Sequence, residues 1–199
     1  MSKAPVRAAF MELRDMGLVT IVPQAGTYVF TPSRKDVEEM SQFRAMLEKE
    51  ALQMALERNR SALVQQLSAA ISQMDHAIAI GDRLRYSTAD SAFHKVILQI
   101  AGNRYLEKAY DLTATALAAL RARLQSGEGD YWHRSYAEHT RMRDLIDQGE
   151  FDAAHALLRE HILIINRSLA LPDTNTLIRQ KAQLRSDQEC QELLLQVQS

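Results

Sequence analysis

The chain has 199 residues, which is enough for one substantial domain or for a small domain joined to a larger one. Its single cysteine, Cys190, excludes a disulfide framework, and no stretch approaches the length of a membrane span, so we expect a cytoplasmic protein that is neither exported nor membrane-bound. The net charge of −1 excludes no partner by itself, but it is unevenly distributed, with +3 on residues 1–35 and −4 on the remainder.

The first 32 residues predict a helix followed by a two-stranded hairpin. Residues 3–16 have the composition of a helix, which Ser2 can cap. Residues 18–22 and 27–30 are rich in β-branched and aromatic side chains, and the Pro-Gln-Ala-Gly run between them is typical of a turn. We therefore expect residues 1–32 to form a small basic unit of a helix and a wing.

Residues 33–171 predict an all-helical antiparallel bundle. Ser33 followed by Asp36 is a capping-box pattern that opens a helix, so we place the domain boundary there. The first apolar stripe at helical spacing consists of Val37, Met40, Phe43, Met46, Leu47, Ala51, Met54 and Ala55. Further helices, separated by glycines, are predicted over residues 61–80, 83–101, 103–125, 131–148 and 151–170. The polar tail, residues 172–199, contains leucines that predict a loosely attached seventh helix.

Four residues with metal-ligating side chains are spaced so that they could meet at one point inside such a bundle. Asp90 and His94 are four apart and share a helix face, although such a pair alone is more often a hydrogen-bonded core pair. His139 precedes Gly149 by ten residues and His161 follows it by twelve, so in an antiparallel hairpin each lies roughly 15–18 Å from the turn. Three imidazoles and one carboxylate would suit Zn²⁺, Ni²⁺ or Mn²⁺ with a position left open. Surface or structural positions are predicted for the remaining histidines, His76, His133 and His155.

Two groups of residues together resemble one family of bacterial transcription regulators. The first resembles the recognition helix and wing of the GntR family and comprises Ser2-Lys3-Ala4-Pro5-Val6-Arg7, Leu13, Gly17-Leu18-Val19 and Gly26. The second resembles the helical FCD effector domain of the FadR-type branch and comprises Asp90-Ser91-Ala92-Phe93-His94, Asn103-Arg104-Tyr105-Leu106, Glu138-His139 and His161. The resemblance covers about residues 2–170 and implies a mostly α fold, an FCD-like bundle preceded by a partial winged helix-turn-helix.

The resemblance also implies roles for particular residues. In that family an acid and three histidines hold a divalent metal at the base of a pocket for small carboxylates, and the matching residues here are Asp90, His94, His139 and His161. Family members often use an arginine on the first effector helix to hold the ligand carboxylate, which implies this role for Arg44. A salt bridge between Arg44 and Glu48 on its own helix explains the arginine equally well. Lesser candidates for the same role are Arg121, Arg123 and Arg143.

The resemblance assigns Lys3, Arg7 and the segment around Gly26 to operator DNA, whereas the alternative is a set of solvated charges. Family members have two further helices before the recognition helix, and this chain starts at that helix, so we expect either a misplaced start or a truncated regulator. The apolar side chains that such a start leaves uncovered are Val6, Phe10 and Leu13. Their exposure weighs against DNA binding by this chain alone.

Three functions are compatible with these patterns. The first is a homodimeric regulator in which a metal-centred pocket binds a small organic acid and changes the geometry of paired DNA-binding units. The second is a dimerising or ligand-binding protein without DNA contact. The third is a metal-dependent enzyme, but Glu138 and Glu160 are each adjacent to a proposed ligand and should point roughly 100° away from it, which leaves no general base. We therefore predict no catalytic residues.

Overall fold

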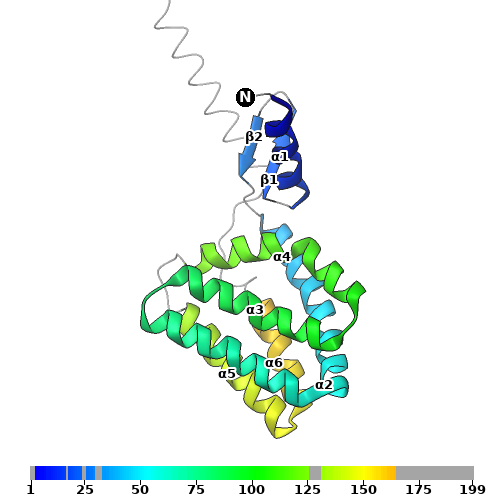
Figure 1. The fold of residues 1–199 in the computed structure, drawn as a ribbon, viewed down its shortest axis with the longest axis vertical. Helices are drawn as coiled ribbons and strands as arrows, with labels where there is room; N and C mark the ends of the chain where they lie inside the picture. The colour runs from blue at the N-terminus through cyan, green and yellow to red at the C-terminus, as the bar shows by residue number, and fades with distance from the viewer. Residues whose placement is uncertain (1–2, 17, 24–25, 30–32, 126–130, 165–199) are drawn as a thin grey trace, which may run out of the picture.

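The computed structural model describes the chain except for residues 1–2, 17, 24–25, 30–32, 126–130 and 165–199. Its first unit contains α1 (Lys3–Asp15) and an antiparallel hairpin of β1 (Val19–Val22) and β2 (Gly26–Val29). The predicted helix and wing are therefore present, whereas Ser2, the expected cap, lies outside the described residues. This unit lies at one end of the long axis of the molecule, beyond the larger group of helices (Figure 1).

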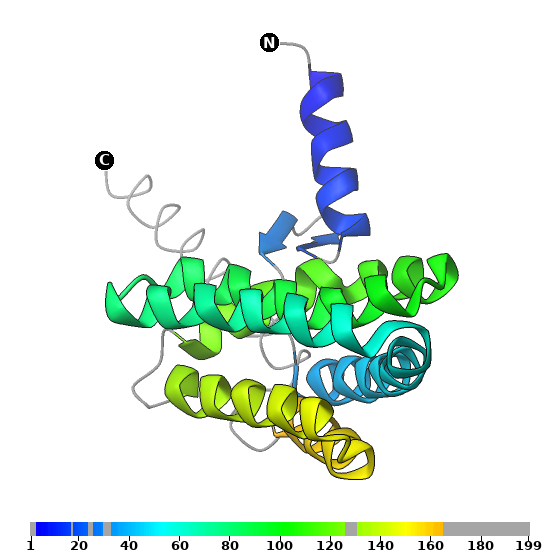
Figure 2. The ribbon, with the colours of Figure 1, turned by 60° about the horizontal axis from the view of Figure 1, so that its bottom comes forward.

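The second unit is a helical bundle, as the sequence predicts, and its described residues form five helices where six were expected: α2 (Arg34–Ala79), α3 (Arg83–Ala101), α4 (Arg104–Gln125), α5 (Tyr131–Gln148) and α6 (Phe151–Leu163). The long α2 contacts α3, α4, α5 and α6, and Figure 2 shows it together with these helices in one bundle. At Asn59, φ is −163° and ψ is 80°, so α2 is broken there into two helical stretches, which the sequence predicts as separate helices. The Asn59 side chain accepts a hydrogen bond from the amide of Ala62 (2.9 Å) and so caps the second stretch.

Local signals in the sequence set the helix ends. The Ser33 side chain accepts from the Asp36 amide (3.1 Å), and the Asp36 carboxylate accepts from the Ser33 amide (2.8 Å), which completes the predicted capping box. Gly149 separates α5 from α6 with φ of +83°, a conformation that side chains disfavour. This turn makes α5 and α6 adjacent, as the depth argument for His139 and His161 requires. The expected seventh helix lies outside the described residues.

The buried face of α2 differs from the predicted apolar stripe. Its first half buries Val37, Ser41, Arg44, Glu48, Ala51, Leu52 and Ala55. Met46, which the sequence places in the stripe, is 61% exposed, so that assignment is wrong. Because α2 presents polar side chains to the interior, the spacing of its apolar residues predicts a buried face that is rotated away from the observed one. Within the described part of the chain, no helix combines the length and apolarity that membrane crossing requires.

Candidate metal centre

Four predicted ligand residues meet in the interior of the bundle. Asp90 and His94 come from successive turns of α3, His139 from α5 and His161 from α6, and all four side chains are buried. One ligand atom of each lies within 4.8 Å of those of the other three. The apolar packing of three helices thus brings together four groups that are expensive to bury unless they bind a common partner.

The distances between these atoms fit a divalent ion. Nε2 of His94 and Nε2 of His139 are 3.2 Å apart, and Oδ1 of Asp90 lies 3.9 Å from the same His139 nitrogen. Neighbouring nitrogens that each lie about 2.0–2.1 Å from one ion are about 2.8–3.0 Å apart in octahedral geometry and about 3.3–3.4 Å apart in tetrahedral geometry. Two imidazole lone pairs that face each other at this distance need a proton or a cation between them. The donor set is therefore suited to a borderline metal with nitrogen and oxygen ligands.

Two further carboxylates hold the histidines from outside the cluster. Oε2 of Glu48 on α2 lies 2.7 Å from Nδ1 of His94, and Oε2 of Glu138 on α5 lies 2.7 Å from Nδ1 of His161. An ionised carboxylate only accepts, so each Nδ1 carries the hydrogen and each Nε2 is left for a metal. Ser135 donates to Asp90 Oδ1 (3.3 Å) and so helps to orient a third ligand.

Sequence reasoning missed both outer carboxylates as part of the site. Glu138 was expected to point away from the cluster because it is adjacent to His139, but it contacts the ligand of the neighbouring helix instead. Glu48 was considered only as the partner of Arg44. The available signal was that Arg44 and Glu48 share the face of Ala51 and Ala55 at helical spacing, which predicts a buried pair.

Arg44 is buried next to this cluster. It is 1% exposed, and its Nε donates to Oε1 of Glu48 (2.5 Å), whose side chain is also fully buried. Burial alone lowers the pKa of Arg44, but attraction to Glu48, Tyr110 and Asp90 outweighs it, so the pKa is raised above its ordinary value and the guanidinium stays charged. Among the described residues, Nη1 and Nη2 of Arg44 have no hydrogen-bond partner. A charged fork with two open nitrogens inside a protein is suited to a carboxylate.

Other predicted site residues lie elsewhere. Arg143 on α5 bonds to Ser68 and Asp144, and the side chains of Arg121 and Arg123 lie outside the described part of the molecule. Lys3 begins α1, Arg7 follows one turn later with an exposed side chain, and Gly26 begins β2. A hollow between α1 and the hairpin is lined by Val6, Arg7, Phe10, Met11, Ile21 and Thr27.

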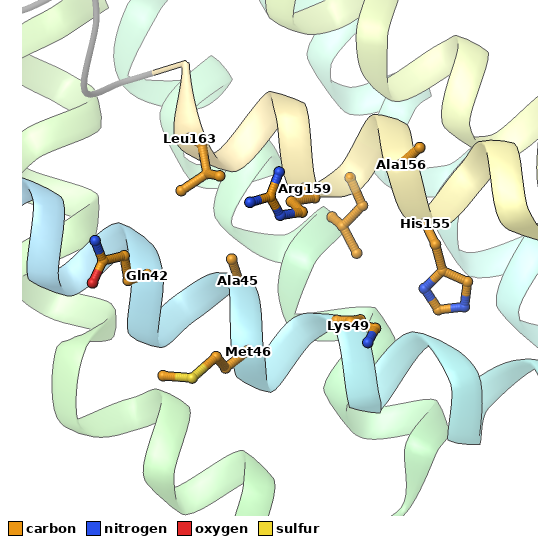
Figure 3. Close-up of a pocket in the computed structure, with 9 residues that line it drawn as sticks. Gln42, Ala45, Met46, Lys49, His155, Ala156, Arg159 and Leu163 are labelled. Atoms are coloured by element: carbon orange, nitrogen blue, oxygen red, sulfur yellow. The ribbon is translucent and has the colours of Figure 1, made fainter.

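A second cavity lies on the outer side of α2 and α6 and contains none of the four ligand residues. This groove, of about 490 Å³, is lined by Gln42, Ala45, Met46, Lys49, His155, Ala156, Leu158, Arg159 and Leu163. Figure 3 shows side chains of both helices facing each other across it. His155 lines the groove, and neither of its ring nitrogens has a hydrogen-bond partner in the described structure. The groove is therefore separate from the buried polar cluster.

The FCD domain model matches residues 39–163, which include all of the ligand cluster, Arg44 and Glu48. The chain belongs to the FCD branch of the GntR family of transcription regulators. A relative from Paenarthrobacter nicotinovorans, the probable D-xylose utilization operon transcriptional repressor, is 27% identical over 162 residues, which are 81% of this chain and 70% of that protein.

Solved GntR-family structures share the fold of this regulator. A GntR transcriptional regulator from Rhodococcus sp. RHA1 aligns with a TM-score of 0.70 at 19% identity, over 84% of this chain and 79% of that one. E. coli McbR/YncC aligns with a TM-score of 0.64 at 15% identity, over 91% of this chain and 82% of its own. The all-helical FCD-like fold predicted from the sequence is thereby confirmed.

Proposed function

We propose that this FCD regulator is a metal-dependent sensor of a small organic acid, in which the four ligand residues hold one divalent metal and Arg44 holds a carboxylate of the effector. The observation that carries the proposal is the charged, buried guanidinium of Arg44, whose Nη1 and Nη2 are open and which is linked through Glu48 to the ligand His94. The metal, when bound, supplies a Lewis acid with a position for an effector oxygen.

The charges of the buried groups favour such a pair of ligands. With neutral histidines, Arg44, Glu48 and Asp90 together carry −1, because one positive and two negative groups are buried. A divalent ion changes this sum to +1, and one carboxylate then brings it to zero. Since uncompensated charge in a protein interior is costly, metal should favour the carboxylate and the carboxylate should favour the metal.

A thermal-shift screen of organic acids on the zinc-loaded protein, followed by calorimetric titration with the strongest acid, tests the proposal. Arg44→Lys keeps the positive charge opposite Glu48 but removes the bidentate fork, so we expect it to weaken carboxylate binding by roughly tenfold to a hundredfold. The matched control is Arg159→Lys in the groove, which should leave the affinity unchanged. Equal affinities of Arg44→Lys and wild type would contradict the role of Arg44.

For the regulator itself we propose a homodimer that meets operator DNA through Lys3, Arg7 and the hairpin at Gly26. The two-fold symmetry of operators read by helix-turn-helix proteins supports a dimer. Light scattering at micromolar concentration tests it, and a monomer would count against the proposal.

A second candidate is a ligand-binding dimer without DNA contact. It is favoured by the exposure of apolar side chains on α1, where Val6 is 46% and Phe10 is 40% exposed. Fluorescence anisotropy with a palindromic operator separates the two, using this chain and an upstream-extended chain. Binding by the extended chain alone would support the second candidate for the chain as it stands.

A further inference from the structure

The Glu48 carboxylate bonds to both halves of the proposed site, the arginine and the metal-ligand cluster. Its Oε1 accepts from Nε of Arg44 (2.5 Å), and its Oε2 lies 2.7 Å from Nδ1 of His94 on α3. Glu48 and Arg44 are one turn apart on α2, and all three side chains are buried. The chain Arg44–Glu48–His94 therefore runs from the open guanidinium nitrogens to a metal-facing nitrogen without an intervening solvent-exposed group.

We propose that Glu48 is a two-sided positioning residue, which fixes the tautomer of His94 for the metal and, with its other oxygen, orients the Arg44 guanidinium for the effector carboxylate. This inference rests on the proposed function. It makes Glu48 the side chain that connects the metal to the effector carboxylate.

The hydrogen-bonding capacity of a carboxylate explains why glutamate is needed at this position. Both neighbours present N–H donors, and only an ionised carboxylate accepts on two oxygens at once. A bond at Nδ1–H leaves the lone pair of His94 on Nε2, the atom that lies 3.2 Å from Nε2 of His139. A bond at Nε of Arg44 immobilises the planar guanidinium without using Nη1 or Nη2.

Glu48→Gln is a sharp test because an amide cannot serve both neighbours. If the Gln oxygen accepts from Arg44, its NH₂ faces His94, which must then accept at Nδ1 and carry its hydrogen on Nε2. That tautomer has no lone pair for the metal. If the amide is reversed, His94 is preserved and the bond to Arg44 is lost. In either case one half of the site is disturbed directly.

Glu138→Gln is the matched control. Glu138 accepts from Nδ1 of His161 at the same distance of 2.7 Å, but its second partner is Arg134 on its own helix and not Arg44. Glu138→Gln should weaken zinc binding by about 10–100-fold, measured by competition with a chromophoric chelator, and Glu48→Gln should do the same if its amide NH₂ faces His94. Only Glu48→Gln should also change the Nε–H resonance of Arg44 or the tautomer of His94 in nitrogen-15 NMR spectra of the metal-free protein.

The wild-type spectrum keeps the test decisive even where a variant does not fold. Metal-free wild type should show His94 with its hydrogen on Nδ1 and a slowly exchanging Nε–H for Arg44. A His94 hydrogen on Nε2, or unchanged His94 and Arg44 signals in folded Glu48→Gln, would overturn the role of Glu48. Failure of wild type to bind zinc would instead contradict the proposed metal function, while both NMR tests of Glu48 would still stand.

Discussion

The inner and outer faces of the α2–α6 pair both carry histidine and basic side chains, which differ in their burial and in their hydrogen-bond partners. On the inner face, His161 bonds to Glu138 and Arg44 bonds to Glu48, and all are buried or nearly so. On the outer face, His155 has no hydrogen-bond partner among the described residues, and Lys49 is largely exposed. The type of a residue and the helix that carries it therefore do not identify a ligand site. The difference lies in the carboxylates that orient each inner group.

The largest expected difference between the faces concerns metal. His139→Gln removes one of four gathered ligands, so we expect zinc affinity to fall by about a hundredfold or more, whereas His155→Gln in the groove should leave it unchanged. Zinc at about 100 times its dissociation constant should stabilise the wild type by ~2.7 kcal/mol and His139→Gln hardly at all. Chemical denaturation with and without zinc measures both effects. If zinc stabilised His139→Gln as much as His155→Gln, the inner and outer histidines would not differ in metal binding.

The next effect is on folding without any ligand. Arg44→Met leaves the Glu48 carboxylate buried without its cation, which should lower the free energy of unfolding by about 3–5 kcal/mol. Lys49→Met, five residues along the same helix, removes only an exposed charge, and the expected loss is less than about 1 kcal/mol. Urea denaturation monitored by circular dichroism compares the two. A similar small loss for both would mean that the inner pair is no more important than a surface pair.

The smallest effect is the titration of His155. Burial lowers its pKa below the ordinary value of 6.5, Lys49 lowers it further, and Asp152 and Glu50 raise it less. Because the folded state favours the neutral ring, its contribution to stability is present above pH 6.5 and is lost as the pH falls through the lower folded pKa. An NMR titration of the ring protons should show Lys49→Met raising this pKa and Asp152→Asn lowering it further. A shift of the same sign in both variants would contradict this assignment of causes.

The sequence predicts much of this architecture because its local signals agree with one another. The Ser33–Asp36 capping box, the Gly149 turn and the helix–hairpin order of the first unit all correspond to observed elements. Because the rise per residue of a helix is constant, counting residues from the Gly149 turn was enough to predict that His139 and His161 lie at similar distances from that turn. The depth of a residue along a helix is thus readable from sequence when a turn provides the reference point.

The face that a helix turns inward is less readable when polar residues are buried. On α2 the interior receives Ser41, Arg44 and Glu48, while Met46 lines the outer groove. Apolar periodicity therefore selected the wrong side for Met46 and made the Arg44–Glu48 pair resemble a surface ion pair. Glu138 was missed for a related reason, because its partner His161 is on another helix and contact between helices has no signature in one sequence.

We propose that the buried cluster of Asp90, His94, His139 and His161 holds a metal. Elemental analysis of the purified wild-type protein, dialysed after exposure to zinc, nickel or manganese, tests it most directly, with the melting temperature recorded before and after chelation. We expect about one divalent ion per chain, because one four-ligand set binds one ion, and a lower melting temperature once the ion is removed. Protein that retains no metal and melts at the same temperature with and without chelator would contradict it.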